Sequence, residues 1–195
     1  GSINNTQHIK DHIESSISIK HSILQDTALI NKIDEVAKVC VNAYKNGNKV
    51  ILAGNGGSAA DSQHIAAEFV SRFRFDRPGL PSIALSTDTS MLTAIGNDYG
   101  YKNLFKRQLE ANGSTGDVFI AITTSGNSEN IIEAVSACPD LGIYSVGLVG
   151  NGGGKLSNMS DYTICVPSEK TELIQESHIM IGHIICGYVE ESLFG

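Results

Sequence analysis

The sequence predicts an α/β fold: a three-layer sandwich with a five-stranded parallel sheet of the flavodoxin-like kind, preceded by two N-terminal helices. After residue 49, short apolar segments alternate with longer helical segments, the order expected of repeated strand–helix units. The apolar segments contain few polar residues, as is typical of parallel strands that helices cover on both faces. Two turns rich in glycine or hydroxyl groups follow apolar segments, where open α/β sheets bind their ligands.

Two helices are expected before the sheet begins, over residues 5–26 and 28–46. The first brings its large apolar residues near one face, namely Ile9, Ile13, Ile17 and Leu24. The second turns an apolar face inward, made of Ile30, Ile33, Val36, Cys40 and Ala43, and Gly47 ends it. Because no strand separates the two helices, we expect residues 5–46 to form an oligomer interface; the alternative is that they pack as a satellite of the sheet.

Strands and helices then alternate to the end of the chain. The expected strands span residues 50–53, 82–85, 117–122, 143–149 and 162–166. The expected helices span residues 58–75, 89–95, 100–112, 127–137 and 172–193. No repeat, linker or low-complexity tract interrupts this order, so we expect one domain over residues 1–195.

The composition limits the classes of function. Of the 195 residues, 41% are hydrophobic and 18% charged, and the net charge is -7 with no block of Lys or Arg, which argues against binding nucleic acid through a basic patch. No apolar stretch reaches membrane-spanning length and no signal peptide opens the chain, so we expect a cytoplasmic protein without a membrane partner. The four cysteines are far apart and form no C-x-x-C pair, which favours free thiols in a reducing compartment.

A glycine-rich turn at residues 54–58 follows the first strand and opens a helix. Its backbone N–H groups suit a phosphate or another anion. His64 and Glu68, one helical turn apart, project from the same face of that helix. An anion cradle therefore neighbours a pair that can do acid–base chemistry or bind a metal, which indicates a small phosphorylated substrate.

This turn also fits a dinucleotide-binding fingerprint, since Gly54, Gly56 and Ala59 match the form G-x-G-x-x-G/A. That fingerprint needs an acidic residue about 20 residues further on, at the end of the next strand. Here the stretch is still the arginine-rich end of a helix, residues 72–77. A nicotinamide-dependent oxidoreductase is therefore disfavoured, and a tight turn without a ligand remains the plainer alternative.

A second loop, residues 123–128, places four hydroxyl groups where a helix begins: Thr123, Thr124, Ser125 and Ser128. Serine and threonine often cap helices, but one cap uses one hydroxyl. Several neutral donors around a helix N-terminus are what a phosphate group requires. We therefore expect an anion site here rather than an over-supplied cap.

The last helix carries a third group of polar residues: Gln175, Glu176, His178 and His183. Each histidine taken alone is more often a packing or surface residue. Gln175 and His183 are separated by roughly 12 Å of helix rise. One metal ion could reach both only if Gln175 lies at the helix entry or if subunits share the site.

Taken together, these motifs resemble the phosphoheptose isomerase family, which belongs to the sugar-isomerase (SIS) domain superfamily. The segments that carry the resemblance are residues 54–73, the presumed turn at 96–98, the loop 123–128 and the segment 174–183. They occur in the same order and cover nearly the whole chain. The resemblance implies an aldose–ketose isomerase that converts sedoheptulose 7-phosphate to D-glycero-D-manno-heptose 7-phosphate through an enediol, the first step of bacterial ADP- or GDP-heptose synthesis for structures such as the lipopolysaccharide core.

The resemblance also implies roles for individual residues. Glu68 would be the catalytic base and His183 the catalytic acid. One zinc ion (Zn²⁺) per subunit would be held by His64, Glu68, Gln175 and His183. The substrate would contact Asn55, Gly56, Gly57, Ser58, Glu68, Asn97, Asp98, Thr123, Thr124, Ser125, Ser128 and Gln175. The family forms homotetramers with active sites between subunits, which would employ the two leading helices.

Two positions depart from the family pattern: Thr123 stands where serine is usual, and Leu173 where an arginine is expected. The first keeps its hydroxyl; the second bears on local packing or on contacts at the edge of the substrate. The alternative function is a non-catalytic SIS-domain protein that only binds, such as a replication-initiator-associating factor. A binding module would use the hydroxyl loops but would not need His64, Glu68, Gln175 and His183 together.

Overall fold

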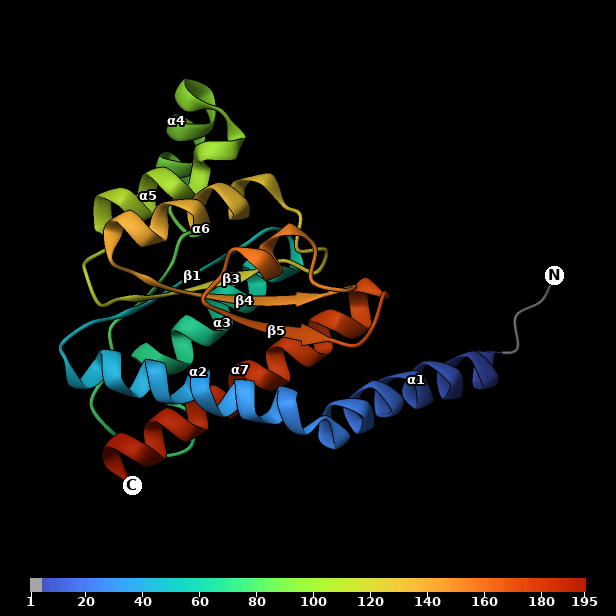
Figure 1. The fold of residues 1–195 in the computed structure, drawn as a ribbon. Helices are drawn as coiled ribbons and strands as arrows, with labels where there is room; N and C mark the ends of the chain where they lie inside the picture. The colour runs from blue at the N-terminus through green and yellow to red at the C-terminus, as the bar shows by residue number, and fades with distance from the viewer. Residues whose placement is uncertain (1–4) are drawn as a thin grey trace.

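The structure, a computed structural model, describes residues 5–195 and has the expected α/β architecture (Figure 1). The single domain expected over residues 1–195 thus includes four residues, 1–4, that lie outside the described part. A five-stranded parallel sheet has the order β2-β1-β3-β4-β5. Its strands are β1 (Val50–Gly54), β2 (Ser82–Ala84), β3 (Val118–Ile122), β4 (Tyr144–Gly150) and β5 (Tyr162–Val166).

Helices cover both faces of the sheet, as Figure 1 shows. One face carries α4 (Thr89–Tyr99), α5 (Leu104–Asn112) and α6 (Glu129–Leu141). The other carries α2 (Thr27–Lys45), α3 (Gly57–Val70) and α7 (Thr171–Phe194). Successive strand residues serve opposite faces: Val50 and Leu52 belong to the core beneath α2, α3 and α7, whereas Ile51 packs with α5 and α6. The prediction of a doubly covered parallel sheet is confirmed.

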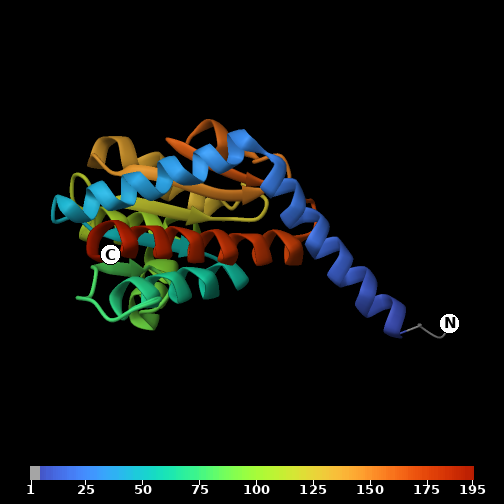
Figure 2. The same ribbon diagram turned by 90° about the horizontal axis from the view of Figure 1, so that it is seen from below.

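The first helix, α1 (Asn5–Gln25), extends away from the body of the molecule (Figure 2). The residues expected on one of its faces are between 52% and 67% exposed: Ile9, Ile13, Ile17 and Leu24. Near its middle, α1 is joined to α7 through Glu176, which accepts a hydrogen bond from Ser16 Oγ at 2.7 Å and lies 3.8 Å from Lys20 Nζ. This Glu176 contact, together with the burial of Ile23 in the core, attaches α1 to the sandwich.

Three expectations about the helices are wrong in detail. Ile30 is exposed rather than inward, because in the first turn of α2 it is Leu29, four residues before the buried Ile33, that faces the core. The presumed turn at residues 96–98 lies inside α4, which ends instead at Gly100, whose φ of 86° suits glycine. The helix expected over 58–75 ends at Val70, for reasons that involve Arg77 and are described below.

No helix within residues 5–195 is both long enough and apolar enough to cross a membrane. All four cysteines are free thiols: Cys40, Cys138 and Cys186 are buried, and Cys165 is half-buried.

Candidate active site

Two helices that run side by side in the same direction, α3 and α7, carry the candidate catalytic residues. Two glycines permit their close approach. A Cβ on Gly57 would lie 2.5 Å from Gln175 Nε2, and a Cβ on Gly182 would lie 2.6 Å from Ile65 Cδ1. The first contact joins the starts of the two helices and the second joins their middles. His183 directly follows Gly182, and Glu68 lies about one turn after Ile65, so the two residues come together.

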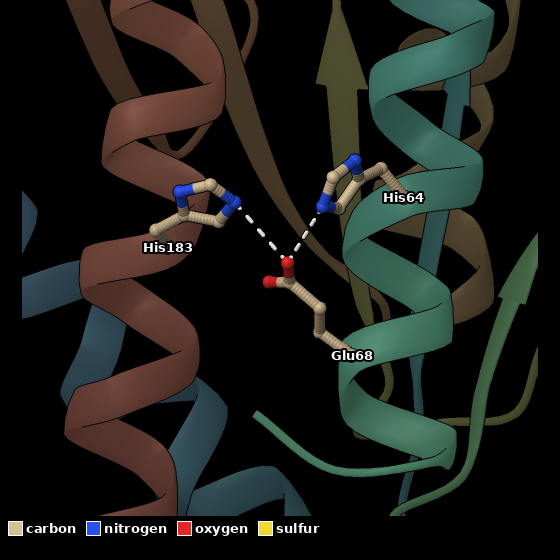
Figure 3. A group of neighbouring side chains, drawn as sticks. All are labelled: His64, Glu68 and His183. Carbon is tan, nitrogen blue, oxygen red and sulfur yellow. Dashed lines mark ion pairs between the residues drawn. The ribbon is translucent and has the colours of Figure 1, made fainter. Parts of the chain in front are cut away.

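Glu68 lies between two imidazoles, as Figure 3 shows. Its Oε1 atom is 2.7 Å from Nε2 of His64 and 3.1 Å from Nε2 of His183. The two imidazole centroids are 5.3 Å apart. One ligand atom from each of the three residues can be chosen so that all lie within 4.8 Å of one another. The sequence indicated the His64–Glu68 pair; the fold adds His183 to it.

The burial of this triad differs from one residue to the next. The Glu68 side chain is 14% exposed, whereas those of His64 and His183 are 54% and 40% exposed. Glu68 Oε2 is buried and has no hydrogen-bond partner. An ionised carboxylate with an unpaired buried oxygen is costly, so the triad suits a site in which a cation or a transferred proton completes the coordination. A surface hollow of about 400 Å³ lies beside it, lined by His64, Glu68 and Arg72 among others.

Gln175 lies at the other end of the same helix pair. Its side chain packs over Gly57 at the start of α3, about 10 Å of helix rise before His64. Within one chain, the structure therefore joins three of the four expected metal ligands and leaves Gln175 near the glycine-rich turn. The sequence argument about the spacing of Gln175 and His183 anticipated this separation.

The hydroxyl groups of the 123–128 loop point toward one another. Thr123 Oγ1 lies 2.8 Å from Ser128 Oγ and 3.5 Å from Ser125 Oγ. Although Ser128 occupies the N-cap position of α6, its side chain makes no capping hydrogen bond. The N–H of Ile131 donates to the carbonyl oxygen of Ser128 at 3.1 Å, and the N–H groups before it in the first turn of α6 can serve an anion. This geometry favours the anion-site interpretation over a simple cap.

A second loop supports the hydroxyl loop from behind. Gly150 N donates to Thr124 O at 3.1 Å, and Leu156 N donates to Gly126 O at 3.0 Å. Between these contacts, four consecutive residues have positive φ: Asn151, Gly152, Gly153 and Gly154. A Cβ on Gly126 would collide with the carbonyl oxygen of Gly153. The hydroxyl loop is thus held tightly at a place where only glycine fits.

The glycine-rich turn is joined to the hydroxyl loop through Asn55. Its side-chain amide exchanges two hydrogen bonds with that of Asn130, both 2.9 Å long. The hydroxyl of Tyr101 donates to Asn55 Oδ1 at 2.8 Å. Gly56 has a φ of 55° at the start of α3, and Ser58 is buried beside it. These contacts link the carboxyl ends of β1 and β3, where both candidate anion sites lie.

Asn97 and Asp98 are exposed near the end of α4, where Asn97 Nδ2 donates to Asp98 Oδ1 at 3.1 Å. Among residues 5–195, no hydrogen bond joins either of them to the triad or to the hydroxyl loop. These two expected substrate residues are therefore not brought into the site within one chain.

Comparisons with known proteins show the family to which the chain belongs. A family model for the SIS domain matches residues 13–150. The chain is 64% identical to a phosphoheptose isomerase of Aneurinibacillus thermoaerophilus, over 96% of this chain and 94% of that protein. The chain belongs to the phosphoheptose isomerase family of SIS-domain proteins. Phosphoheptose isomerase 2 of Campylobacter jejuni is 60% identical over 98% of this chain and 96% of that protein.

The fold of this phosphoheptose isomerase family member agrees with a solved structure. A phosphoheptose isomerase from Francisella tularensis superposes with a TM-score of 0.92 at 38% identity. The match covers 97% of this chain and 100% of that protein's chain. The close structural match covers α1 and α2 as well as the sheet, because so little of the chain lies outside it.

Sequence reasoning missed several residues that hold the candidate site in place. Asn130 and Tyr101 hold Asn55, and Phe73 packs against His183 with ring centroids 5.5 Å apart. Asn130 sits in the first turn of the helix that the hydroxyl loop opens, so its position was a usable signal. Nothing in the local pattern around Tyr101 or Phe73 indicates a contact with residues so distant in the sequence.

Proposed function

We propose that this chain interconverts sedoheptulose 7-phosphate and D-glycero-D-manno-heptose 7-phosphate as an aldose–ketose isomerase. The observation that carries the proposal is the Glu68 carboxylate set between the imidazoles of His64 and His183, in a chain 64% identical to a phosphoheptose isomerase. A module that only binds sugar phosphates needs no such triad. The reaction needs a carboxylate and an imidazole close together beside a phosphate site.

The isomerisation requires two kinds of proton transfer. A base removes a proton from C1 of the ketose and returns it to C2, and we assign this role to Glu68. A second group donates a proton to O2 while accepting one from O1, and we assign this role to His183, because an imidazole can both donate and accept a proton. With Glu68 Oε1 and His183 Nε2 only 3.1 Å apart, both groups can reach neighbouring atoms of one enediol.

The triad also has the donor set for a divalent metal. Two imidazole nitrogens and one carboxylate are ligands that zinc accepts, and the buried Oε2 of Glu68 has no other partner. We propose that His64, Glu68 and His183 hold Zn²⁺, with Gln175 of a neighbouring subunit as the remaining ligand. When bound, the ion supplies Lewis-acid polarisation of the substrate oxygens.

The substrate's phosphate group would bind at the hydroxyl loop. Hydroxyl groups of Thr123, Ser125 and Ser128 converge there, and the helix α6 presents its N-terminal N–H groups. Asn55, Gly56, Gly57, Ser58 and Thr124 would line the path from this loop toward α3. We retain Asn97 and Asp98 as substrate residues only in an assembly where a neighbouring subunit supplies them.

We further propose that the chain works as a homotetramer whose active sites lie between subunits. The exposed stripe of Ile9, Ile13 and Ile17 on the protruding helix α1 supports this proposal, because apolar surface of that extent marks an interface. A shared site would also bring Gln175, Asn97 and Asp98 within reach of a triad. The free thiols suit a reducing compartment such as the cytoplasm.

The test is an isomerase assay of the purified protein with sedoheptulose 7-phosphate, before and after removal of metal with a chelator and after addition of Zn²⁺. We expect turnover that the chelator abolishes and Zn²⁺ restores. If the phosphate group binds at the hydroxyl loop, an analogue of the substrate that lacks the phosphate should not be turned over. Absence of turnover in the zinc-loaded protein would overturn the proposed function.

A further inference from the structure

A buried ion pair behind the active site joins α7 to the segment that follows α3. Arg77 Nε donates to Glu190 Oε2 at 2.9 Å, and both side chains are only 1% exposed. The Glu190 carboxylate accepts two further hydrogen bonds, from the backbone N–H of Phe73 at 2.7 Å and from that of Arg74 at 2.9 Å. One carboxylate on α7 therefore fixes the backbone of residues 73–74.

Arg77 connects the same ion pair to the helix that carries Glu68. Its Nη2 donates to the carbonyl oxygen of Glu68 at 2.7 Å, and its Nη1 donates to that of Phe69, also at 2.7 Å. The last carbonyl groups of a helix lack partners within the helix, and the fork of guanidinium donors supplies them here. This explains why α3 ends at Val70 and not at residue 75.

Phe73, which the Glu190 carboxylate holds by its backbone, lies against His183. The two rings are stacked, with centroids 5.5 Å apart and planes inclined by 24°. Gly187 makes room for this contact, because a Cβ there would lie 3.3 Å from Phe73 Cε1. His183, Gly187 and Glu190 are spaced so that they share one face of α7. That face presents the imidazole, the space for the phenyl ring and the carboxylate in turn.

We propose that Glu190, Arg77 and Phe73 are positioning residues, which set the end of α3 and the ring of His183 so that Glu68 and His183 meet in working geometry. Where the test measures turnover, this inference rests on the proposed function. None of the three is assigned contact with substrate. They act through the Glu68 backbone on one side and through the His183 ring on the other.

The magnitude of the effect follows from how such supporting contacts behave. Residues that orient a metal ligand or a catalytic group change metal affinity or activity by about 10–100-fold when they are replaced. Burial raises the carboxyl pKa of Glu190, but the N–H groups of Arg74 and Phe73 and the Arg77 guanidinium outweigh it and hold that pKa below its ordinary value. The ion pair is therefore formed at neutral pH.

The experiment compares Glu190→Gln and Phe73→Leu with the unaltered protein. We expect each to lower kcat about 10-fold or more with KM for the sugar phosphate changed less than about threefold, and to weaken Zn²⁺ binding by a similar factor. Phe73→Tyr keeps the ring and should restore kcat. Phe73→Leu should also shift the ring-proton NMR resonances of His183, since they lose the ring current of Phe73.

The matched control is Asp117→Asn. Asp117 and Lys49 form another ion pair, 2.7 Å long, in which the Asp117 side chain is 1% exposed, and the two residues lie just before β3 and β1 begin. This variant should lower the unfolding temperature while leaving kcat unchanged. If Glu190→Gln and Phe73→Leu likewise change only stability, the three residues are structural and the inference is overturned.

The experiments distinguish failure of the proposed function from failure of the positioning proposal. An inactive zinc-loaded wild-type protein would refute the proposed function, yet the NMR shift and the Zn²⁺ affinity of Phe73→Leu would still test positioning. Should Glu190→Gln fail to fold, Phe73→Leu alone decides, because this half-buried side chain leaves the ion pair intact.

Discussion

Nε2 of His183 and Oε1 of Glu68 lie 3.1 Å apart, although the two residues belong to the last helix and to the first helix after β1. His64 contacts the same carboxylate oxygen from the other side, at 2.7 Å. Two imidazoles and one carboxylate, each able to carry a proton or bind a cation, therefore meet at Oε1 of Glu68. The His64–Glu68 pair follows from the spacing along α3, whereas the contact with His183 depends on how α3 and α7 pack.

The first prediction concerns this pair. Glu68→Gln and His183→Gln should each lower kcat for sedoheptulose 7-phosphate by about 10²–10⁴-fold, since each removes a positioned proton-transfer group. Circular dichroism and thermal unfolding should show an intact fold. Glu110→Gln, an exposed change on α5, serves as the control and should keep full activity. Wild-type turnover in purified Glu68→Gln would eliminate the proposed mechanism.

The second prediction concerns the hydroxyl loop. Ser125→Ala should raise KM for the phosphorylated substrate roughly 10- to 100-fold with little change in kcat. A hydrogen bond to a charged group contributes about 1.5–3 kcal/mol, and about 1.4 kcal/mol corresponds to a factor of ten. Ser136→Ala, an exposed serine further along α6, is the matched control. An unchanged KM in Ser125→Ala would remove this loop from the phosphate site.

The third prediction concerns pH and the buried His178. Burial lowers the pKa of its imidazole to about 4, against a hydrogen bond with the carbonyl of Val149 that favours the charged form. Between pH 6.5 and 4 the unfolded chain binds a proton here that the folded chain does not. Stability is therefore complete above pH 6.5 and falls as the pH drops, by about 3 kcal/mol from this residue.

Chemical denaturation at several pH values measures this effect. His178→Gln should flatten the fall in unfolding free energy between pH 6.5 and 4, relative to the unaltered protein, which isolates His178 from the carboxylates. His8→Gln, at an exposed position on α1, should leave the curve unchanged. If the curves of the His178→Gln and wild-type proteins run parallel, His178 does not control acid stability.

The fourth prediction concerns assembly. Replacing Ile13 and Ile17 by Glu should convert the proposed tetramer to smaller species, because both apolar side chains are exposed on the protruding helix. Light scattering coupled to size exclusion measures the mass. Ser22→Glu adds one negative charge to the opposite side of α1, at about 100° of rotation per residue, and should preserve the assembly. A monomeric wild-type protein would contradict the proposal outright.

The order of strands and helices could be predicted from the sequence because each apolar segment reports its own local environment. The His64–Glu68 pair was also visible, since helical spacing alone places both on one face. The hydroxyl loop was visible for a similar reason, as all of its residues are neighbours in the chain.

The remaining features depend on contacts between distant segments. The end of α3 could not be predicted, because Arg77 and Glu190 set it through the tertiary fold. The presumed turn at 96–98 was wrong because Asp88 caps α4 by accepting from Met91 N, and only Gly100 stops the helix. Ile30 was wrongly assigned inward because Leu29 and Ile30 are both apolar, and hydrophobicity alone does not say which of the two faces the core.

Along α7, almost every turn contacts a different part of the molecule. Gln175 packs at the start of α3, and Glu176 accepts a hydrogen bond from α1. His178 hydrogen-bonds to β4, and Glu190 hydrogen-bonds to the backbone of residues 73–74. Removing or adding one residue midway would rotate everything beyond it by about 100°. Such a change would part His183 from Glu68 and Glu190 from Arg77 in a single event. A substitution at an exposed position such as Ile184 disturbs none of these contacts, whereas an insertion or deletion within the helix would break several of them together.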